Sequence, residues 1–231
     1  MADSYLIEQF EKFFKNFKLY QYKKRSLILK SNDISSSVFY IKSGYIRVFR
    51  ISENGEELTL AILKSHDFFP LTYGIGNSHQ SYYLEAITPL ELWKAPQELF
   101  IDFVKKDPEL FYELTQRLLI RFDGVLARIE SMAFSNAYTK VATILLMCAK
   151  GLGESFGEQI ILRVPLTHKD IATMIGITRE TTSLEMKKIE RKGLVKRQGK
   201  YLVIADYGKL QEECLKTSQG QLLSESRSVF V

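Results

Sequence analysis

The sequence contains few cysteines, and this scarcity excludes several classes of protein. Only two occur in 231 residues, Cys148 and Cys214. Two cysteines exclude a disulfide framework and a cysteine-ligated cluster, and they are typical of a reducing cytoplasm. Long apolar runs are lacking too: the longest, residues 141–149, is far below the roughly 20 residues that a membrane helix needs. The beginning of the chain mixes acidic residues with apolar ones, so we expect no secretory signal, no membrane partner and a cytoplasmic protein.

Positive charge is concentrated in one segment near the C-terminus. The chain carries 32 Lys and Arg against 27 Asp and Glu, a net charge of +5. Residues 163–200 hold ten of these cations and four acids, so they net +6 and the rest of the chain nets −1. Such a confined excess is typical of a module that binds a polyanion. Charge alone fits a solvated surface better, so this interpretation needs a motif to support it.

The first part of the chain is predicted to form short β-strands. Between residues 19 and 95, stretches such as SVFYIKSGYIRVFRIS cluster β-branched and aromatic residues, and turn signals separate them. Asn54 and Gly55 predict a hairpin, because both residues tolerate positive φ. Many short strands at this spacing indicate a closed or double-sheet barrel.

A heptad pattern follows Pro96. From Phe111 to Met132 apolar residues recur every seven positions over about three repeats and predict a helical seam. Its members are Phe111, Leu118, Phe122, Val125, Ile129 and Met132, with Thr115 interleaved. Leu119 and Leu126 lie beside the seam, where they are expected to pack against the chain's own barrel. A core helix would show part of this pattern, but a seam with a second apolar flank favours a homodimer helix.

The remaining chain is predicted to be mainly helical. Residues 137–150 are expected to form an apolar helix, 151–158 a glycine-rich loop and 159–165 a short strand, followed by two short helices and a hairpin over 194–206. From about residue 211 we expect a polar tail that is either poorly ordered or a marginal helix. The predicted fold class is α+β, with domains at 1–95, 96–133 and 134–210 and a tail at 211–231.

Residues 167–195 have the spacing of a helix–turn–helix. Thr167 and Asp170 resemble a capping box at the start of one helix. Gly176 then supplies the turn, and Thr178 caps a second helix. The apolar side of this second helix is formed by Met186, Ile189 and, at its end, Leu194.

The opposite side of the second helix is predicted to read DNA bases. An α-helix fits the major groove, where donors and acceptors near its N-terminus contact base edges. The candidate base-reading residues are Arg179, Glu180, Ser183, Leu184 and Lys187. Phosphate contacts are expected from Thr167, His168, Lys169, Thr178, Thr181, Lys188, Arg191, Lys192, Lys196, Arg197 and Lys200. The alternative, a buried helical hairpin with a solvated basic face, leaves the coincidence of two caps, a glycine turn and a charge excess unexplained.

The stretch LTHKDIATMIGITRETTSLEMKKIERKGLV, residues 166–195, resembles the winged helix–turn–helix of the Crp/Fnr family of bacterial transcription regulators. Residues 38–69 resemble the family's N-terminal barrel, so the resemblance covers nearly the whole chain. It implies a jelly-roll-like sensory barrel (a double-stranded β-helix), a long dimerisation helix and a winged head hinged at Phe134. It further implies a homodimeric regulator with RNA polymerase as a partner. Two recognition helices, residues 179–192, would enter successive major grooves of a palindromic operator about 34 Å apart.

The recognition helix departs from the family at Leu184. Family members usually show Arg-Glu-Thr-Val-Ser-Arg, whereas residues 179–184 read RETTSL. The last Arg commonly contacts a guanine in the family, and Leu184 has no donor for guanine O6 or N7. Two interpretations stay open: Leu184 meets a thymine methyl, or it packs locally while other residues carry specificity.

The sensory pocket departs further. Cyclic-AMP-binding members resemble GDFFGEL…RS, whereas Pro70 and Leu71 replace the Gly-Glu pair and Gln80 precedes Ser81 where Arg would stand. Without that guanidinium the charge-assisted phosphate bonds are lost, so cyclic AMP is not expected. A remaining pocket would suit an unknown apolar or aromatic effector, and a barrel filled by its own side chains is the equal alternative. The candidate lining is Phe68, Phe69, Leu71, Tyr73, Gln80, Ser81, Tyr82, Tyr83, Val125 and Leu126.

No cofactor or metal is predicted. The family's oxygen sensors carry an N-terminal iron–sulfur cluster, and the N-terminus of this chain has no cysteine to ligate one. Haem is not expected either, because His66, His79 and His168 stand alone and a lone histidine is more often hydrogen-bonded. An enzyme is not expected, since no nucleophile–base arrangement or phosphate loop is present. The alternative function is a ligand-sensing module whose basic C-terminal domain binds an acidic partner in place of specific DNA.

Overall fold

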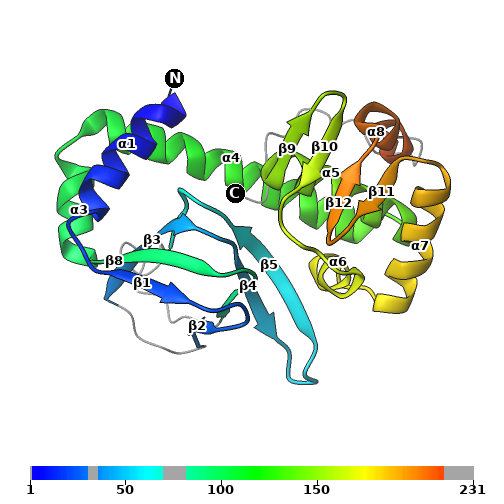
Figure 1. Cartoon of the computed structure of the whole chain (residues 1–231), viewed down its shortest axis with the longest axis horizontal. Helices are drawn as coiled ribbons and strands as arrows, with labels where there is room; N and C mark the ends of the chain where they lie inside the picture. The colour runs from blue at the N-terminus through cyan, green and yellow to red at the C-terminus, as the bar shows by residue number, and fades with distance from the viewer. Residues whose placement is uncertain (1, 31–35, 70–81, 216–231) are drawn as a thin grey trace. The chain divides into compact units, whose positions relative to one another are not determined.

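The computed structural model describes residues 2–30, 36–69 and 82–215 (Figure 1). The chain divides into two compact units: Met1–Arg50 with Ile62–Leu119, and Ile51–Ala61 with Ile120–Val231. The division falls inside one continuous helix and not at its ends, because that helix contributes residues to both units. The domain boundaries near residues 95 and 133 stay predictions.

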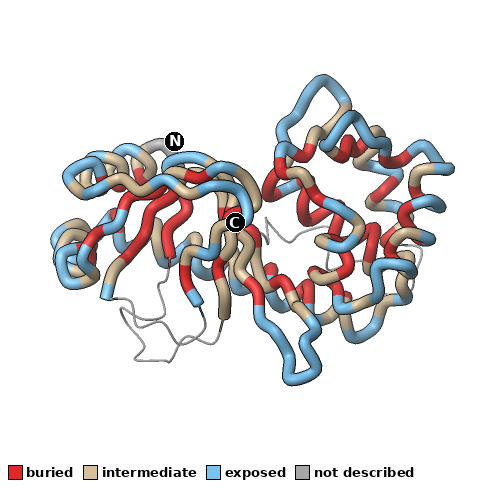
Figure 2. The backbone as a smooth tube through the Cα atoms, turned by 60° about the horizontal axis from the view of Figure 1, so that its bottom comes forward, coloured by how far each residue is buried: buried red, intermediate tan, exposed pale blue. Residues whose placement is uncertain are grey.

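The N-terminal part of the chain forms two four-stranded sheets, in the orders β1-β8-β3-β6 and β2-β7-β4-β5. All but the β4–β5 turn and most of β5, residues 51–61, belongs to the first unit. Neighbouring strands are antiparallel wherever their register is defined. This is a jelly-roll-like double sheet and not a closed barrel. The strands are β1 Leu19–Tyr22, β2 Leu27–Leu29, β3 Ser37–Ser43, β4 Ile46–Ile51, β5 Glu57–Leu63, β6 Phe68–Phe69, β7 Tyr83–Ala86 and β8 Leu90–Pro96. Figure 2 shows their buried stretches in red and the exposed connections in pale blue.

The predicted hairpin at Asn54 and Gly55 is confirmed. Gly55 adopts φ 81°, the left-handed region that favours glycine. Its N–H donates to the carbonyl of Ser52 at 3.0 Å, and the Ser52 N–H donates to the carbonyl of Glu56 at 2.8 Å. Turn chemistry therefore fixes where strand β4 reverses into β5.

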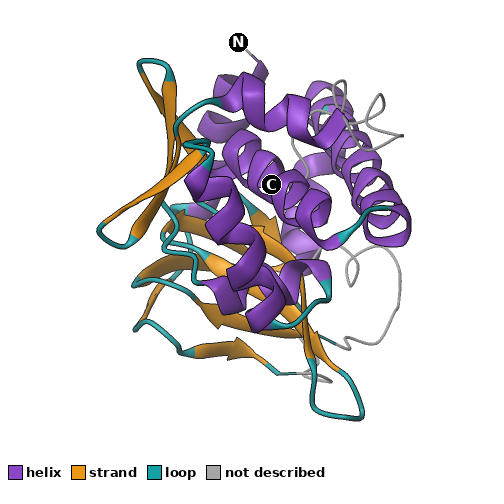
Figure 3. Ribbon diagram, turned by 90° about the vertical axis from the view of Figure 1, so that its right-hand side faces the viewer, coloured by secondary structure: helices purple, strands orange, loops and turns teal. Residues whose placement is uncertain are grey.

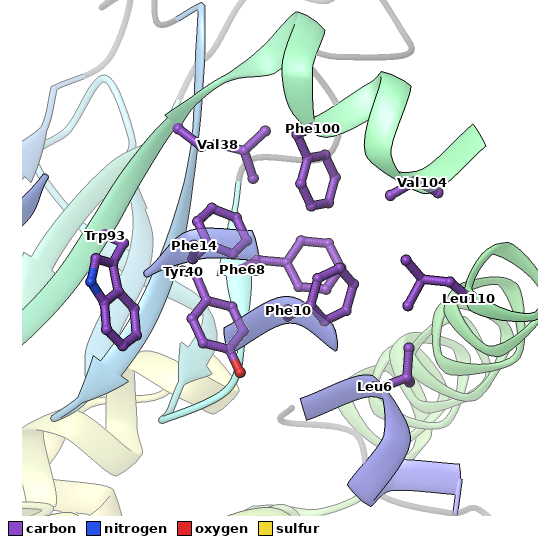
Figure 4. Close-up of a cluster of buried hydrophobic side chains, with 11 residues drawn as sticks. Leu6, Phe10, Phe14, Val38, Tyr40, Phe68, Trp93, Phe100, Val104 and Leu110 are labelled. Atoms are coloured by element: carbon purple, nitrogen blue, oxygen red, sulfur yellow. The ribbon is translucent and has the colours of Figure 1, made fainter. Parts of the chain in front are cut away.

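A helix that the sequence analysis missed supplies much of the core. Helix α1, Ala2–Phe14, buries Leu6, Phe10 and Phe14, which lie four residues apart on one helical face. The ring of Phe10 lies 5.1 Å from that of Phe68 on β6, and Phe14 stacks on Tyr40 of β3 at 5.0 Å (Figure 4). Aromatic pairs at these separations add to the free energy of burial.

The helical region after Pro96 contains two helices in place of the single one predicted. Helix α3 runs Gln97–Lys105 and helix α4 runs Pro108–Phe134. The break lies at Asp107, whose Oδ1 accepts the N–H groups of Glu109 and Leu110 at 3.1 and 3.0 Å. Proline suits the first position of a helix because its missing N–H has no partner there in any case.

The second unit alternates helices and strands, purple and orange in Figure 3. Its elements after α4 are α5 Ala137–Leu152, β9 Gly153–Phe156, β10 Gln159–Leu162, α6 His168–Ile175, α7 Arg179–Arg191, β11 Val195–Gln198, β12 Tyr201–Ile204 and α8 Tyr207–Leu215. The strands form one sheet in the order β11-β12-β10-β9. The α+β fold class with a winged helix–turn–helix is confirmed.

Two local expectations for this unit were wrong. The predicted glycine-rich loop contains strand β9, which pairs with β10 and turns at Gly157 with φ 60°. The predicted polar tail begins later, because α8 buries Leu210 and Cys214 and packs against α5. Both elements depend on partners elsewhere in the chain, which local composition does not reveal. Residues 216–231 lie outside the described part.

Candidate nucleic-acid interface

Helix α6 begins and ends as predicted. The Thr167 hydroxyl accepts the N–H of Asp170 at 3.2 Å, and Asp170 Oδ2 accepts the N–H of Thr167 at 2.7 Å, which completes the capping box. The helix ends at Gly176, which adopts φ 65° and donates its N–H to Ala172. A side chain there would be strained by this positive φ. The glycine thus sets the angle at which the next helix starts.

Helix α7 presents one face to solvent and buries the other. Thr178 caps it by accepting the N–H of Thr181 at 3.1 Å. Thr182, Glu185, Met186 and Ile189 are buried. The five predicted base-reading residues lie on the outer face, where Arg179, Glu180, Leu184 and Lys187 are exposed and Ser183 is half-buried. The structure therefore brings these side chains together near the N-terminus of one helix.

Leu184 is 60% exposed. Its neighbour Thr182 is fully buried and donates its hydroxyl to the carbonyl of Thr178 at 2.9 Å. The buried residues of α7 pack inside the unit, whereas the methyl groups of Leu184 are exposed on the outer face of the helix.

The predicted phosphate-binding residues occupy both helix starts, the end of α7 and the wing. Lys169, Lys188, Lys196, Arg197 and Lys200 are exposed. The threonines have a structural use as well, since Thr167 and Thr178 are caps. Backbone N–H groups at two helix N-termini together with surface cations are an arrangement that suits an anion.

Lys192 differs from the other predicted phosphate contacts. Its ammonium group is paired with the carboxylate of Glu213 on α8, and it lies 4.8 Å from the ring centre of Tyr138. Tyr138 also donates its hydroxyl to Glu213 at 2.7 Å. The phosphate contact of Lys192 stays a prediction, and in the single chain its partner lies in the segment predicted to be a tail.

His168 lies among the cations of the interface. Burial chiefly, and then the nearby Arg197, lower the pKa of His168 below its ordinary value. Arg179 and Lys187 act in the same direction, and Glu190 opposes them. Burial is thus the main reason that the imidazole is disfavoured as a cation, and the surrounding cations add to it.

The wing sheet carries a surface hollow that the sequence analysis did not identify. It is lined by Phe156, Gln159, Ile161, Arg163, Lys196, Arg197 and Gln198. Phe156 is 75% exposed, and Arg163 is paired with Glu154 at 2.6 Å. Its lining comes from β9, the β10 region and β11, which come together only in the folded sheet, so no local sequence signal identifies it.

The seam residues of α4 form an exposed apolar strip. Phe111, Leu118, Phe122, Val125 and Ile129 are all exposed, and Met132 is half-buried. Leu119 and Leu126 are exposed too, so the expectation that they pack on the chain's own barrel was wrong. A strip of this length on one helix marks an interaction surface.

The effector-pocket residues are only partly described. Phe68 belongs to the aromatic core, Phe69 stacks on Phe39 at 5.1 Å, and Tyr83 stacks on Phe49 at 5.4 Å. Tyr82 is half-buried, and Val125 and Leu126 are exposed on α4. Leu71, Tyr73, Gln80 and Ser81, together with Pro70 and His79, lie outside the described residues. The pocket therefore stays a prediction.

The cysteine and histidine side chains that could bind a metal or cofactor are buried or lie beside a polar group. Burial raises the pKa of the Cys148 and Cys214 thiols to about 12 and about 11. Nδ1 of His66 lies 3.1 Å from the hydroxyl of Tyr40. Within residues 2–30, 36–69 and 82–215, no three His, Cys, Asp or Glu side chains gather as a metal site. No helix in this part of the chain has the length and apolar character needed to cross a membrane.

Comparison with known proteins assigns both units to described domain families. Residues 139–213 match the Crp-like helix-turn-helix domain, and residues 19–107 match the cyclic nucleotide-binding domain. A global nitrogen regulator from Synechocystis sp. is 30% identical over 65% of this chain and 68% of its own. The cAMP-activated global transcriptional regulator CRP of Pasteurella multocida is 24% identical over 84% of this chain and 93% of its own. A CooA mutant from Carboxydothermus hydrogenoformans has a similar structure, with a TM-score of 0.71 and 26% identity over 88% of this chain and 90% of that one.

Proposed function

Because the chain belongs to the Crp/Fnr family of transcription regulators, we propose that it acts as a homodimer that reads a palindromic DNA operator with helix α7. The observation that carries this proposal is the division of α7 into two faces. Its buried face packs in the unit, and its outer face gathers Arg179, Glu180 and Ser183 beside the N-terminus. That is the end of a recognition helix that enters the major groove.

Each group on the outer face suits a particular base edge. Arg179 can donate two hydrogen bonds to guanine, and Glu180 can accept from the amino group of cytosine. Leu184 has no donor, and its exposed methyl groups suit the methyl group of thymine. The cations of the two helix starts and the wing then supply contacts to phosphate, which set register and orientation but not sequence.

Dimerisation is proposed on the exposed strip of α4. A helix whose apolar residues recur every seven positions packs against a second copy of itself. The two recognition helices then lie related by a twofold axis, and a twofold protein requires a palindromic site. We place this dimer in the cytoplasm, with RNA polymerase as a further partner and no enzymatic activity of its own.

For the first unit we propose a sensor that does not use cyclic AMP. Gln80 stands where the nucleotide-binding members carry the Arg that neutralises the phosphate. An apolar or aromatic effector, or constitutive activity with no effector, fits the residues better. No iron–sulfur cluster, haem or other cofactor is part of the proposal.

Selection from random duplex DNA tests the proposed function. The purified full chain, without added ligand and at near-physiological salt, should enrich a palindrome whose half-sites lie one helical turn apart. Binding that is salt-dependent but enriches no sequence would favour the alternative, a basic domain that docks on an acidic partner. If selection succeeds only after a small molecule is added, the first unit requires an effector.

A further inference from the structure

Arg128 joins three separate segments of the second unit. It lies on α4 and is only 9% exposed. Its Nε donates to the carbonyl of Met174 on α6 at 3.1 Å, and its Nη1 donates to the carbonyl of Leu60 at 2.7 Å. Its Nη2 donates to the carbonyls of Thr59 and Met174. The long helix, the β4–β5 hairpin and the helix–turn–helix are therefore held by one side chain.

The carbonyls that Arg128 binds are ones for which the local structure supplies few donors. Met174 lies in the last turn of α6, where carbonyls have no intrahelical N–H. The N–H groups of Gly176 and Ile177 both go to Ala172. Strand β5 is at the edge of its sheet, so its outer carbonyls also need a donor from outside. A guanidinium offers five donors in a fixed fork and brings a positive charge to the negative end of a helix.

A second contact links the same two segments without Arg128. Thr59 is fully buried on the hairpin, and its hydroxyl lies 2.8 Å from that of Thr173 on α6. The Thr173 hydroxyl donates to the carbonyl of Asp170 at 2.8 Å. Its only proton is thus used, and the Thr59 hydroxyl is the donor in the pair.

We propose that Arg128, Thr59 and Thr173, here called the clasp, are positioning residues for DNA readout: they fix α6, and with it the recognition helix, at one angle to the dimer helix. This inference rests on the proposed function. The clasp is closed while Arg179, Glu180 and Leu184 all remain exposed, so it belongs to an arrangement that can bind DNA.

The consequence concerns the palindrome and not the single half-site. Two heads held at a fixed angle bind two half-sites as one rigid body, and the second contact gains from a high effective concentration. Without the clasp each head retains its own residues for base and phosphate contacts, but the pair loses its preset spacing. Opening the clasp therefore weakens palindrome binding and leaves half-site binding unchanged.

The test uses the full chain with Thr59→Val, Arg128→Met and Arg128→Lys. Thr143→Val is the matched control, since Thr143 is a buried threonine of the same unit outside the clasp. Dissociation constants are measured for the selected palindrome, a single half-site and a scrambled duplex. We expect Arg128→Met to weaken palindrome binding more than about tenfold and Thr59→Val severalfold. Arg128→Lys should recover part of the loss, with half-site and scrambled affinities unchanged throughout.

Several results would contradict the proposed role of the clasp. Thr59→Val, which removes one uncharged hydroxyl, keeps the test decisive if Arg128→Met does not fold. Equal palindrome affinity in wild type and Thr59→Val would overturn the proposal, and so would tighter binding, which would mean that the clasp restrains the head. A loss of equal size on the half-site would indicate a purely structural role. If the wild type itself shows no preference for any duplex, the proposed function has failed rather than the clasp.

Discussion

Replacing Phe122 with alanine should largely abolish dimerisation. Phe122 lies at the middle of the strip on α4 and is 58% exposed in the single chain. A Phe side chain offers about 200 Å² for burial, which leaves about 115 Å² for a partner to cover. At about 25 cal/mol per Å² this is worth about 3 kcal/mol, of which alanine retains about a third. The dimer contains two copies, so the loss is about 4 kcal/mol, or a rise of about 1000-fold in the dimer dissociation constant.

Sedimentation across a protein concentration series measures this constant directly. Phe156→Ala is the matched control, because Phe156 is 75% exposed on β9 and is not a member of the α4 strip. Alanine is also a better helix former than phenylalanine, so a loss of dimer at Phe122 does not come from a weakened helix. The reasoning is refuted if Phe122→Ala and Phe156→Ala dimerise with the same constant as the wild type.

Three further predictions concern charge, protonation and thiol access. Lys196→Gln should lower the slope of log K against log salt by about 2 per dimer, because each lost phosphate contact removes about 0.9; an unchanged slope in a binding titration would remove Lys196 from the phosphate contacts. Burial lowers the pKa of His168, so below about pH 6.5 the unfolded chain binds more protons than the folded chain, and the free energy of unfolding falls with acid. In urea unfolding, His168→Gln should therefore lose less free energy of unfolding than the wild type between about pH 7.5 and about pH 5.5. Equal losses in the two proteins would contradict this assignment. Cys148 and Cys214 should resist a thiol reagent until the protein is unfolded, and rapid labelling of either thiol in the native state would contradict their burial.

The helix–turn–helix was predictable because its signals act over short distances. Thr167 and Asp170 satisfy each other's backbone groups within one turn, and Gly176 is needed where φ is positive. The outer face of α7 follows from helical periodicity alone once Thr178 fixes its start. Each of these features depends on the types of residues that lie within four positions of one another in the sequence.

Features that depend on distant partners were not predictable in the same way. Strand β9 exists because β10 pairs with it, and Lys192 is held by Glu213 on a helix that was expected to be a tail. Helix α1 is a different case, since the four-residue spacing of Leu6, Phe10 and Phe14 in the sequence already indicates one apolar helix face.

Arg128 is the residue whose role is hardest to predict from the sequence. A charged residue on a helix is normally solvated, and the sequence around Arg128 gives no reason to expect it to be buried. Its acceptors are backbone carbonyls of Thr59, Leu60 and Met174, and a carbonyl is common to every residue type. Burial lowers the pKa of this guanidinium to about 10, so it still carries its charge near neutral pH. Only the folded arrangement of three segments reveals the site.

Sequence selection with wild type and Leu184→Arg side by side tests most directly whether the outer face of α7 reads bases. Arginine restores two donors to a helix position that is exposed in the structure, and a bidentate pair with guanine is worth about 1–3 kcal/mol of discrimination. Both proteins should select palindromes that differ at one symmetric position in each half-site, where Leu184→Arg prefers guanine. Identical motifs from the two proteins would contradict the placement of α7 in the major groove.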